Sequence, residues 1–481
     1  MTEKEVPPVK KLLIAMAVTL GPVVGMLGTG EASAASTAEL WASRYNGPAD
    51  SYDRAVDVAA SPDGTAVFVI GQSFGPLRVS YYETIAYSAS SGAQLWARRY
   101  TAGGIGHDAP SDVAVSPDGT RVFVTGGTAR ETSGSDATTI AYTASTGDRL
   151  WARRYIGPTN GGAGGSSLTV SSDGSMVFIT GSISSGATDD SNYLTVAYDA
   201  ATGARRWVSR YDGPDGGDSN NDYASSIASS PDGSKIFVTG GSYGGVTGSA
   251  YATITYDATT GNRLWVKRYE FKKFDNVNSA RAIAVSPDGE TVFVTGLSAG
   301  EDTDWDYATI AYDAATGTTS WEKRYNGPPG SEMDAASALA VSPDGSKVFV
   351  TGESRQELGS NYDYATLAYD ATTGHKQWLK RYDGPGNGDD HAYSIAVSPD
   401  GSSVFVTGGS GDFSAQGDYA TLAYDASTGA KRWVERYNGP SNEWDRAMSV
   451  AVSPDGTRVF VTGASFNAAG YDDFATIAYA A

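Results

Sequence analysis

Acidic side chains at regular intervals are the residues of this sequence best suited to chemistry. A turn of the form Ser-x-Asp-Gly occurs eight times, and an acidic or amide residue stands eight positions before its serine in seven copies: Asp53, Asp108, Asp222, Asn278, Asp334, Asp390 and Asp445. The remaining copy has Ala163. Such oxygens, gathered at one place, could bind a hard cation such as Ca²⁺ or a polar ligand. They could instead accept backbone N–H groups and fix a loop, which the pattern favours because repeated positions usually serve the repeat.

Two acidic loops also have a spacing that calcium could use. The first contains Asp218, Asn220 and Asp222, and the second contains Asp302, Asp304 and Asp306. Oxygen ligands at alternate positions suit Ca²⁺, but neither loop has the glycine and distal glutamate of an EF-hand. The sequence therefore favours solvated turns here, with calcium as the candidate cofactor if a metal binds.

Acid–base catalysis has few candidates. The sequence contains three histidines, and His375 lies in a predicted turn, whereas His107 stands beside Asp108 and His391 beside Asp390. No phosphate loop, zinc-ligand spacing or nucleophile motif accompanies them. Exposed loop histidines are the favoured interpretation.

These residues lie within a repeat that predicts the whole fold. The motif Trp-x-x-Arg-Tyr also occurs eight times, and the two motifs alternate with a period of about 56 residues. Each period contains four short segments rich in β-branched and aromatic residues, separated by turn residues. This predicts an all-β, eight-bladed β-propeller with one four-stranded antiparallel sheet per repeat. The lone N-terminal segment 40–45 should complete the C-terminal blade and close the ring.

Side-chain size predicts the strand order within each blade. Small residues two, four and six positions before the turn serine mark the innermost strand, where the blades converge. Bulky residues mark the outermost strand, where tryptophans should dock neighbouring blades: Trp41, Trp96, Trp151, Trp207, Trp265, Trp321, Trp378 and Trp433. The arginine of the same motif should pair with a carboxylate such as Asp313, between neighbouring sheets.

Composition limits the class of protein. Residues 1–34 have three lysines, an apolar segment and an Ala-Ser-Ala sequence, which predict a secretory signal followed by one propeller domain, 35–481. No later segment is apolar enough to span a membrane. The formal charge of −20 argues against nucleic-acid binding, and the absence of cysteine means that no disulfide stabilises the exported protein. We expect a secreted or envelope-associated monomer.

Two motifs carry a resemblance to known families. The segment from Ala311 through Asp313, Thr316 and Gly317 to Trp321 resembles the docking motif of the eight-bladed quinoprotein (PQQ-like) dehydrogenases. The Ser-Pro-Asp-Gly half resembles Tyr-Val-Thr-Asn-type and related bacterial propeller repeats. The copies ending at Trp96 and Trp151 depart from the docking motif, with Ser88 and Thr143 in place of its aspartate.

The resemblance implies a propeller and says less about activity. Quinoprotein dehydrogenases hold pyrroloquinoline quinone (PQQ) and calcium over the axis with acidic and amide ligands, a stacking tryptophan and often a vicinal disulfide. Those roles cannot be assigned to residues of this sequence, which has no cysteine pair. The near-uniform blades favour a secreted binding or scaffold propeller for an unknown protein or small polar ligand. The alternatives are a PQQ-dependent oxidoreductase and a metal-dependent, lactonase-like or lyase-like enzyme.

Overall fold

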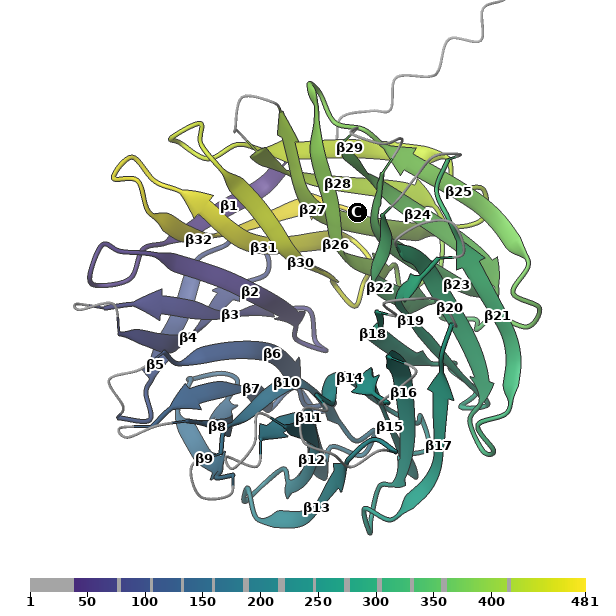
Figure 1. The fold of residues 1–481 in the computed structure, drawn as a ribbon. Helices are drawn as coiled ribbons and strands as arrows, with labels where there is room; N and C mark the ends of the chain where they lie inside the picture. Colours follow the sequence, from purple (N-terminus) through teal and green to yellow (C-terminus); the bar gives the residue numbers. More distant parts are fainter. Residues whose placement is uncertain are drawn as a thin grey trace, which may run out of the picture. The chain divides into compact units, whose positions relative to one another are not determined.

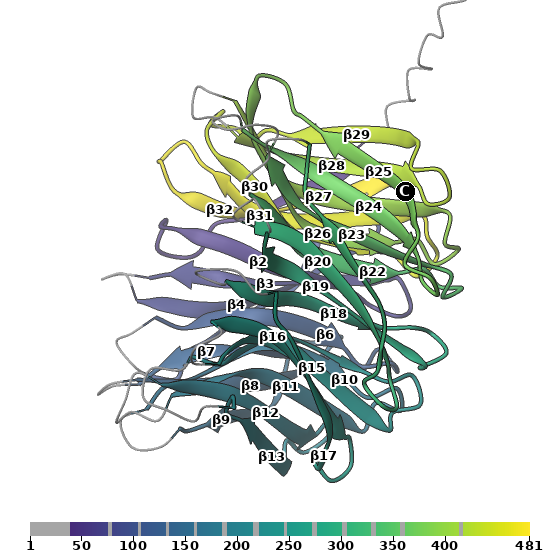
Figure 2. The same ribbon diagram turned by 45° about the vertical axis from the view of Figure 1, so that its right-hand side comes forward.

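The computed structural model describes residues 39–481 except 76–78, 104–106, 131–133, 158–160, 185–189, 215–220, 245–247, 272–276, 301–304, 329–332, 356–360 and 413–416. These residues form eight four-stranded antiparallel sheets, the blades of a propeller, and the predicted fold class is confirmed (Figure 1). The innermost strand of each blade begins the repeat, and in blades 1 to 7 the next three strands follow outward in chain order. Figure 2 shows successive blades face to face.

The first four blades have the following strands. Blade 1 contains β2 (Asp53–Ala60), β3 (Ala66–Phe74), β4 (Ser80–Ser88) and β5 (Gln94–Tyr100). Blade 2 contains β6 (Ala109–Val115), β7 (Arg121–Ala129), β8 (Ser135–Thr143) and β9 (Arg149–Tyr155). Blade 3 contains β10 (Ala163–Val170), β11 (Met176–Ser184), β12 (Ser191–Asp199) and β13 (Arg205–Tyr211). Blade 4 contains β14 (Tyr223–Ser229), β15 (Lys235–Tyr243), β16 (Ser249–Asp257) and β17 (Arg263–Tyr269).

The other four blades repeat this arrangement. Blade 5 contains β18 (Asn278–Val285), β19 (Thr291–Ala299), β20 (Trp305–Asp313) and β21 (Thr319–Tyr325). Blade 6 contains β22 (Asp334–Val341), β23 (Lys347–Arg355), β24 (Tyr362–Asp370) and β25 (Lys376–Tyr382). Blade 7 contains β26 (Asn387–Val397), β27 (Ser403–Asp412), β28 (Gly417–Asp425) and β29 (Lys431–Tyr437). Blade 8 contains β30 (Asp445–Val452), β31 (Arg458–Phe466), β32 (Asp472–Ala480) and the N-terminal strand β1 (Glu39–Tyr45).

The turn between the first two strands of a blade is held by its own side chains. In blade 6, the Asp344 carboxylate accepts hydrogen bonds from the Ser342 hydroxyl at 2.6 Å and the Ser346 backbone N–H at 3.0 Å. These bonds lower the pKa of Asp344 to about 2. Gly345 has a φ of 71°, which a residue with a side chain adopts at a cost. The Ser-Pro-Asp-Gly sequence therefore forms the tight turn that its residues predict.

The outer tryptophans connect neighbouring blades. Trp265 of blade 4 donates its indole N–H to the Ala314 carbonyl of blade 5 at 3.2 Å. Its ring lies so close to Gly317 that a Cβ there would be 2.8 Å from it. Six other tryptophans make the equivalent bond: Trp41 to Ala89, Trp96 to Ala144, Trp151 to Ala200, Trp207 to Ala258, Trp321 to Ala371 and Trp378 to Ala426. Trp433 packs against Tyr479, with ring centroids 6.0 Å apart.

The N-terminal strand closes the ring. Strand β1 pairs antiparallel with β32, with Trp41 opposite Ala478 and Tyr45 opposite Phe474. It supplies the outermost position of blade 8, so that blade has the same four-strand order as the others. The predicted closure is confirmed, and it covers an edge of β32 that would otherwise be free to pair with another chain.

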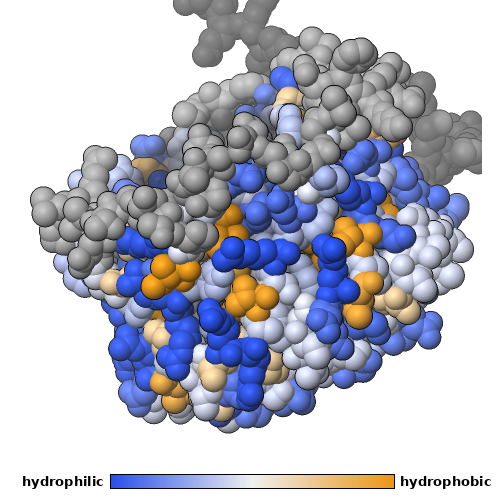
Figure 3. Space-filling view, turned by 60° about the horizontal axis from the view of Figure 1, so that its bottom comes forward, coloured by the Kyte–Doolittle hydropathy of each residue, from blue (hydrophilic) through white to orange (hydrophobic). Residues whose placement is uncertain are grey.

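No helix among the described residues is long and apolar enough to cross a membrane. On the face seen in Figure 3, hydrophobic residues form separate groups among hydrophilic ones. This agrees with a core that lies between the blades, where aromatic residues such as Phe68 and Tyr82 are buried.

Candidate functional site

The entry end of the propeller, where each innermost strand begins, contains the residues that the repeat pattern singled out. All seven acidic or amide residues are buried there, with exposed fractions of 0 to 2%: Asp53, Asp108, Asp222, Asn278, Asp334, Asp390 and Asp445. Six of them lie at or next to the start of their own innermost strand, and Asp390 is the fourth residue of β26. The link from the previous blade and the end of the second strand lie beside it.

These residues are bonded to the backbone of their own loops. Asp390 accepts the Gly384 N–H at 2.6 Å, and Asp222 accepts N–H groups from Gly213 at 2.6 Å and Tyr243 at 3.0 Å. Equivalent bonds run from Gly47 to Asp53, from Ala102 and Ala129 to Asp108, from Gly327 to Asp334 and from Gly439 to Asp445. The Asn278 amide donates to the Ser249 carbonyl at 2.8 Å. Fixing the loop between blades is therefore a role that these side chains perform.

The repeated carboxylates interact with acids of the adjoining strands. Burial raises the pKa of Asp53, and the nearby Asp473 contributes in the same direction. Burial likewise raises the pKa of Asp445, with a contribution from Asp418. Asp473 and Asp418 belong to the third strands β32 and β28 of the preceding blades, and not to the set of seven.

The arginine of Trp-x-x-Arg-Tyr also lies at this end, and the partner predicted for it is wrong. Arg324 binds Asp306, at the start of β20 in the same sheet, with an N–O distance of 2.8 Å. Its guanidinium also donates to the Tyr269 hydroxyl of the preceding blade at 2.8 Å. Asp313 instead accepts N–H and hydroxyl groups of Thr316 in its own turn, which lower its pKa. The turn aspartate is already used locally, so the arginine pairs with a carboxylate at the other end of that strand.

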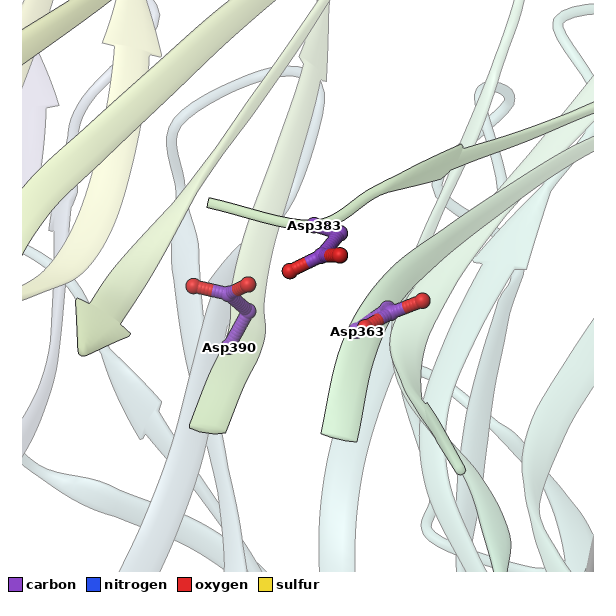
Figure 4. A group of neighbouring side chains, drawn as sticks. All are labelled: Asp363, Asp383 and Asp390. Carbon is purple, nitrogen blue, oxygen red and sulfur yellow. The ribbon is translucent and has the colours of Figure 1, made fainter. Parts of the chain in front are cut away.

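One group of acids could hold a metal ion. Carboxylate oxygens of Asp363, Asp383 and Asp390 lie within 4.8 Å of one another, with Asp383 between the other two (Figure 4). Burial and the two neighbouring carboxylates raise the pKa of Asp390 to about 6. However, Arg381 already binds Asp363 at 2.9 Å. Calcium needs six to eight oxygens, so this group meets its requirements only in part.

We therefore expect calcium to leave the thermal stability unchanged. The melting temperature should differ by less than about 1 °C between excess CaCl₂ and EDTA. Calcium raises it only if the ion binds the folded protein more tightly than the unfolded chain. Asp383→Asn tests the acidic group, and Asp212→Asn is the matched control because Asp212 is exposed on an equivalent loop beside Asp222. A calcium-dependent rise that Asp383→Asn abolishes and Asp212→Asn retains would contradict this expectation.

The acidic loops are described only in part. Asp218, Asn220, Asp302 and Asp304 lie outside the described residues. Their neighbours Asp222 and Asp306 are buried and are bonded to a backbone N–H and to Arg324, respectively. The calcium-loop hypothesis stays a prediction.

The two candidate histidines have different surroundings. His107 is exposed, with its ring centroid 6.0 Å from that of Phe74. His391 is half-buried, its Nδ1 contacts a Glu353 carboxylate oxygen, and its ring stacks on Tyr393 at 6.1 Å. The structure therefore separates the two histidines, and only His391 has an acidic side chain in contact.

A pair of inner carboxylates was missed by the sequence analysis. Asp57 and Asp112 follow the bulges in the adjacent innermost strands β2 and β6. Asp57 accepts the Ser449 hydroxyl at 2.7 Å and the Val113 N–H at 3.0 Å. Burial raises the pKa of Asp57, while burial and the neighbouring Asp57 carboxylate raise that of Asp112 well above its usual range. The sequence does contain a pattern that could have revealed this pair. Both aspartates stand four positions before the turn serine, where the other copies have serine or alanine.

A cleft between blades 8 and 1 was also missed. It has a volume of about 490 Å³, and its lining includes Arg54, Trp444, Arg446, Met448, Phe466 and Asp472. The strands that form it, β30 and β31 in yellow and β2 in purple, lie side by side in Figure 1. Arg54 pairs with Asp472 at 2.5 Å. No single motif could predict the cleft, because its sides come from opposite ends of the chain.

The cleft does not fit the quinone and calcium pair that the resemblance implies. Asp472 is the one carboxylate of its lining, and Arg54 already binds it. The acidic group of blades 6 and 7 includes no residue of the cleft. The described residues therefore bring no set of metal ligands next to this cavity.

Comparisons with solved structures support the fold. A europium-containing methanol dehydrogenase is 13% identical with a TM-score of 0.53, and the match covers 92% of this chain and 93% of that one. A quinohemoprotein alcohol dehydrogenase from Pseudomonas putida is 15% identical with a TM-score of 0.56, over 92% and 76% of the two chains. Sqt1 from Chaetomium thermophilum, solved with the N-terminus of ribosomal protein L10, is 12% identical with a TM-score of 0.57, over 89% and 97%.

The sequence comparisons identify the family. No curated protein sequence matches this chain significantly. A sequence profile of the PQQ_2 family, described as "Outer membrane protein assembly factor BamB", matches residues 30–309 and 306–473. The matches extend over most of the sequence and across the repeats of the propeller. The chain therefore belongs to the family of outer membrane protein assembly factor BamB, within the PQQ-like propellers.

Proposed function

We propose that this protein is an exported binding or scaffold propeller with no catalytic centre of its own. The observation that carries the proposal is that the repeated aspartates at the entry end are already hydrogen-bonded to the backbone. The carboxylates with the best spacing for chemistry accept backbone N–H groups of their own loops, as Asp390 does from Gly384. Seven of the eight blades have such a residue, whereas a catalytic centre needs a departure from the repeat.

The family and the N-terminal sequence support this proposal. The family description is that of an assembly factor, a role that fits a binding or scaffold protein. Residues 1–34 have the pattern of a secretory signal, which supports export. Structural neighbours include two dehydrogenases and a propeller bound to a ribosomal protein segment, so likeness of fold favours neither catalysis nor binding.

Two enzymatic alternatives predict different results. A quinoprotein-like oxidoreductase would need PQQ and calcium, and a metal-dependent lactonase-like or lyase-like enzyme would use a group such as Asp363, Asp383 and Asp390. Purified protein of residues 35–481 should contain no stoichiometric metal by mass spectrometry and should hydrolyse no simple lactone. One bound metal per chain, with lactone hydrolysis that EDTA abolishes and metal restores, would sink the proposal in favour of the second alternative.

A further inference from the structure

A second cleft, here called the rim cleft, lies between the outer parts of blades 5 and 6. It has a volume of about 320 Å³, and the outermost strands β21 and β25 that border it lie at the periphery of the ring in Figure 1. Its lining includes Lys323, Tyr325, Leu367, Tyr369, His375 and Lys376. Three of these residues can carry a positive charge, and none of them is acidic.

The two lysines of the rim cleft extend toward each other from the two blades. A Cβ added to Gly374 of blade 6 would lie 2.8 Å from the Cε of Lys323, so the end of this side chain reaches the turn that precedes His375. Lys376 is paired with Tyr369 in its sheet, so the two side chains lie on the same face. That face is turned toward blade 5, because the Tyr369 ring lies 6.0 Å from that of Trp321. Both lysine side chains therefore enter the same cleft.

The charge of these lysines is not neutralised within the described part of the chain. No described carboxylate lies within ion-pairing distance of either ammonium group. The nearby acid Glu322 accepts the Tyr269 hydroxyl of blade 4 at 2.7 Å, on the opposite face of β21. Asp370 accepts the N–H and the hydroxyl of Thr373 in its own turn, at 2.9 and 2.7 Å. Two like charges thus face each other across the cleft, and a bound anion would relieve their repulsion.

The repeat does not require this concentration of charge. The position two residues after the outer tryptophan faces the turn of the next blade, and Ser43 and Ser209 there donate to the carbonyl of the turn glycine at 2.6 and 2.7 Å. A neutral donor therefore suffices to connect the blades. At this position and the two after the turn glycine, three basic residues occur together only as Lys323, His375 and Lys376. Other boundaries have at most two, as in Arg98, Asp148 and Arg149 or in Lys380, Ala430 and Lys431.

We propose that the rim cleft binds the phosphate group of a phosphate monoester, with Lys323 and Lys376 as its counter-charges and His375 as a further hydrogen-bond donor. Such a phosphate has a charge of about −1.5 to −2 near neutral pH and three strong acceptor oxygens. Two lysines match that charge, whereas a single carboxylate would leave one of them without a partner. Lysine binds phosphate as a compact point charge, so no planar geometry is needed. The inference goes beyond the proposed function and does not rest on it.

The protein has only three histidines, so the NMR signal of the His375 ring reports directly on the rim cleft. The test titrates the protein with inorganic phosphate and with glycerol phosphate, at constant pH and ionic strength, and follows the Cε1–H signals of the histidines. His375 is assigned as the signal that is missing from His375→Gln. We expect this signal to shift saturably, with half of the shift at about 1 mM ligand or below. The signals of His107 and His391, at the entry end, should stay in place.

Variants test the two lysines. Lys323→Gln and Lys376→Gln should each weaken phosphate binding by about tenfold or more, because each removes a charge-assisted hydrogen bond. Lys267→Gln is the matched control, since Lys267 makes the same contact with the turn of blade 5: a Cβ added to Gly317 would lie 2.9 Å from its Cε. Two threonines follow that glycine in place of a histidine and a lysine, so this variant should bind phosphate like the parent protein. Melting temperatures check that each variant is folded.

Two sources could provide the phosphate: a soluble phosphorylated molecule, or the headgroup of a lipid. Cosedimentation with phosphatidylcholine vesicles, with and without phosphatidic acid, separates them. Binding that requires phosphatidic acid and is lost in Lys376→Gln identifies the lipid, whereas binding of glycerol phosphate without vesicle binding identifies a soluble ligand.

Three results would overturn this inference: no saturable shift of the His375 signal, equal shifts of all three histidine signals, or an equal loss of binding in Lys267→Gln and Lys323→Gln. The last two would show a general effect of charge and not a site. None of these results involves turnover, so the inference can fail while the proposed non-catalytic function stands. Catalysis would refute the proposed function and leave the phosphate data unchanged.

Discussion

Deleting residues 37–46 should cause aggregation or lower the melting temperature by about 10 °C or more. The deletion removes β1, so β32 loses its pairing partner. It also removes Trp41, which is 8% exposed and donates to the Ala89 carbonyl of blade 1. Loss of one buried tryptophan alone costs about 3 to 5 kcal/mol, and the exposed strand edge adds a route to aggregation. Thermal unfolding and size-exclusion chromatography of the deletion variant measure both effects.

The same strand provides a control and a rescue. Leu40 is 46% exposed on β1, so Leu40→Ser should leave the melting temperature close to that of the parent protein. A synthetic peptide of residues 37–46 should restore part of the stability by pairing with β32. An unchanged melting temperature in the deletion variant would mean that β1 does not close the ring.

Asp112→Asn should stabilise the protein above pH 7. The folded-state pKa values of Asp57 and Asp112 are raised, so the folded protein retains protons that the unfolded chain releases. Their contribution to stability is fully present below the ordinary aspartate pKa and is lost as pH rises through the raised values. An asparagine cannot ionise, and its amide could donate to Asp57. We expect a gain of about 1 to 3 kcal/mol at pH 8, because a tenfold change in proton affinity between the folded and unfolded states corresponds to about 1.4 kcal/mol.

Denaturant unfolding at pH 5 and pH 8 checks this prediction. The gain from Asp112→Asn should shrink at pH 5, where the wild-type pair retains a proton. Asp118→Asn is a control of opposite sign, because hydrogen bonds from Ser116 and Thr120 lower the pKa of Asp118 to about 2. Its wild-type contribution is lost as pH falls, so this variant should be destabilised at neutral pH. A gain from Asp112→Asn that is equal at both pH values would show that ionisation of the pair is not its cause.

The repeat made the fold predictable. Turn residues recur with the spacing of four antiparallel strands, and tryptophan marks the outer strand in every copy, as Trp265 does against Ala314. Closure followed from the strands left over at the two chain ends. A one-dimensional pattern suffices here because each blade contacts mainly its neighbours.

The site was less predictable because it depends on departures from the repeat. Asp57 and Asp112 stand at a position that the size rule assigned to small residues, and bulges place them beside the backbone of the next blade. The cleft that Arg54 and Phe466 line forms only because the last blade packs on the first. The partner predicted for Arg324 was wrong because the turn aspartate, Asp313, already accepts hydrogen bonds from Thr316, and Arg324 pairs with Asp306 instead. Side-chain contacts between blades depend on how neighbouring sheets are aligned in space, and a motif within one repeat does not specify that alignment.

The central claim, that the propeller binds without catalysis, is tested most directly by a dye-linked oxidation assay. Purified protein of residues 35–481 would be incubated with PQQ and CaCl₂ and supplied in turn with alcohols, aldehydes and sugars, with an active quinoprotein dehydrogenase as the positive control. We predict that dye reduction will not exceed that of PQQ and calcium without protein. Dye reduction that requires the protein, saturates with added quinone and depends on one of the substrates would contradict the claim and establish an oxidoreductase.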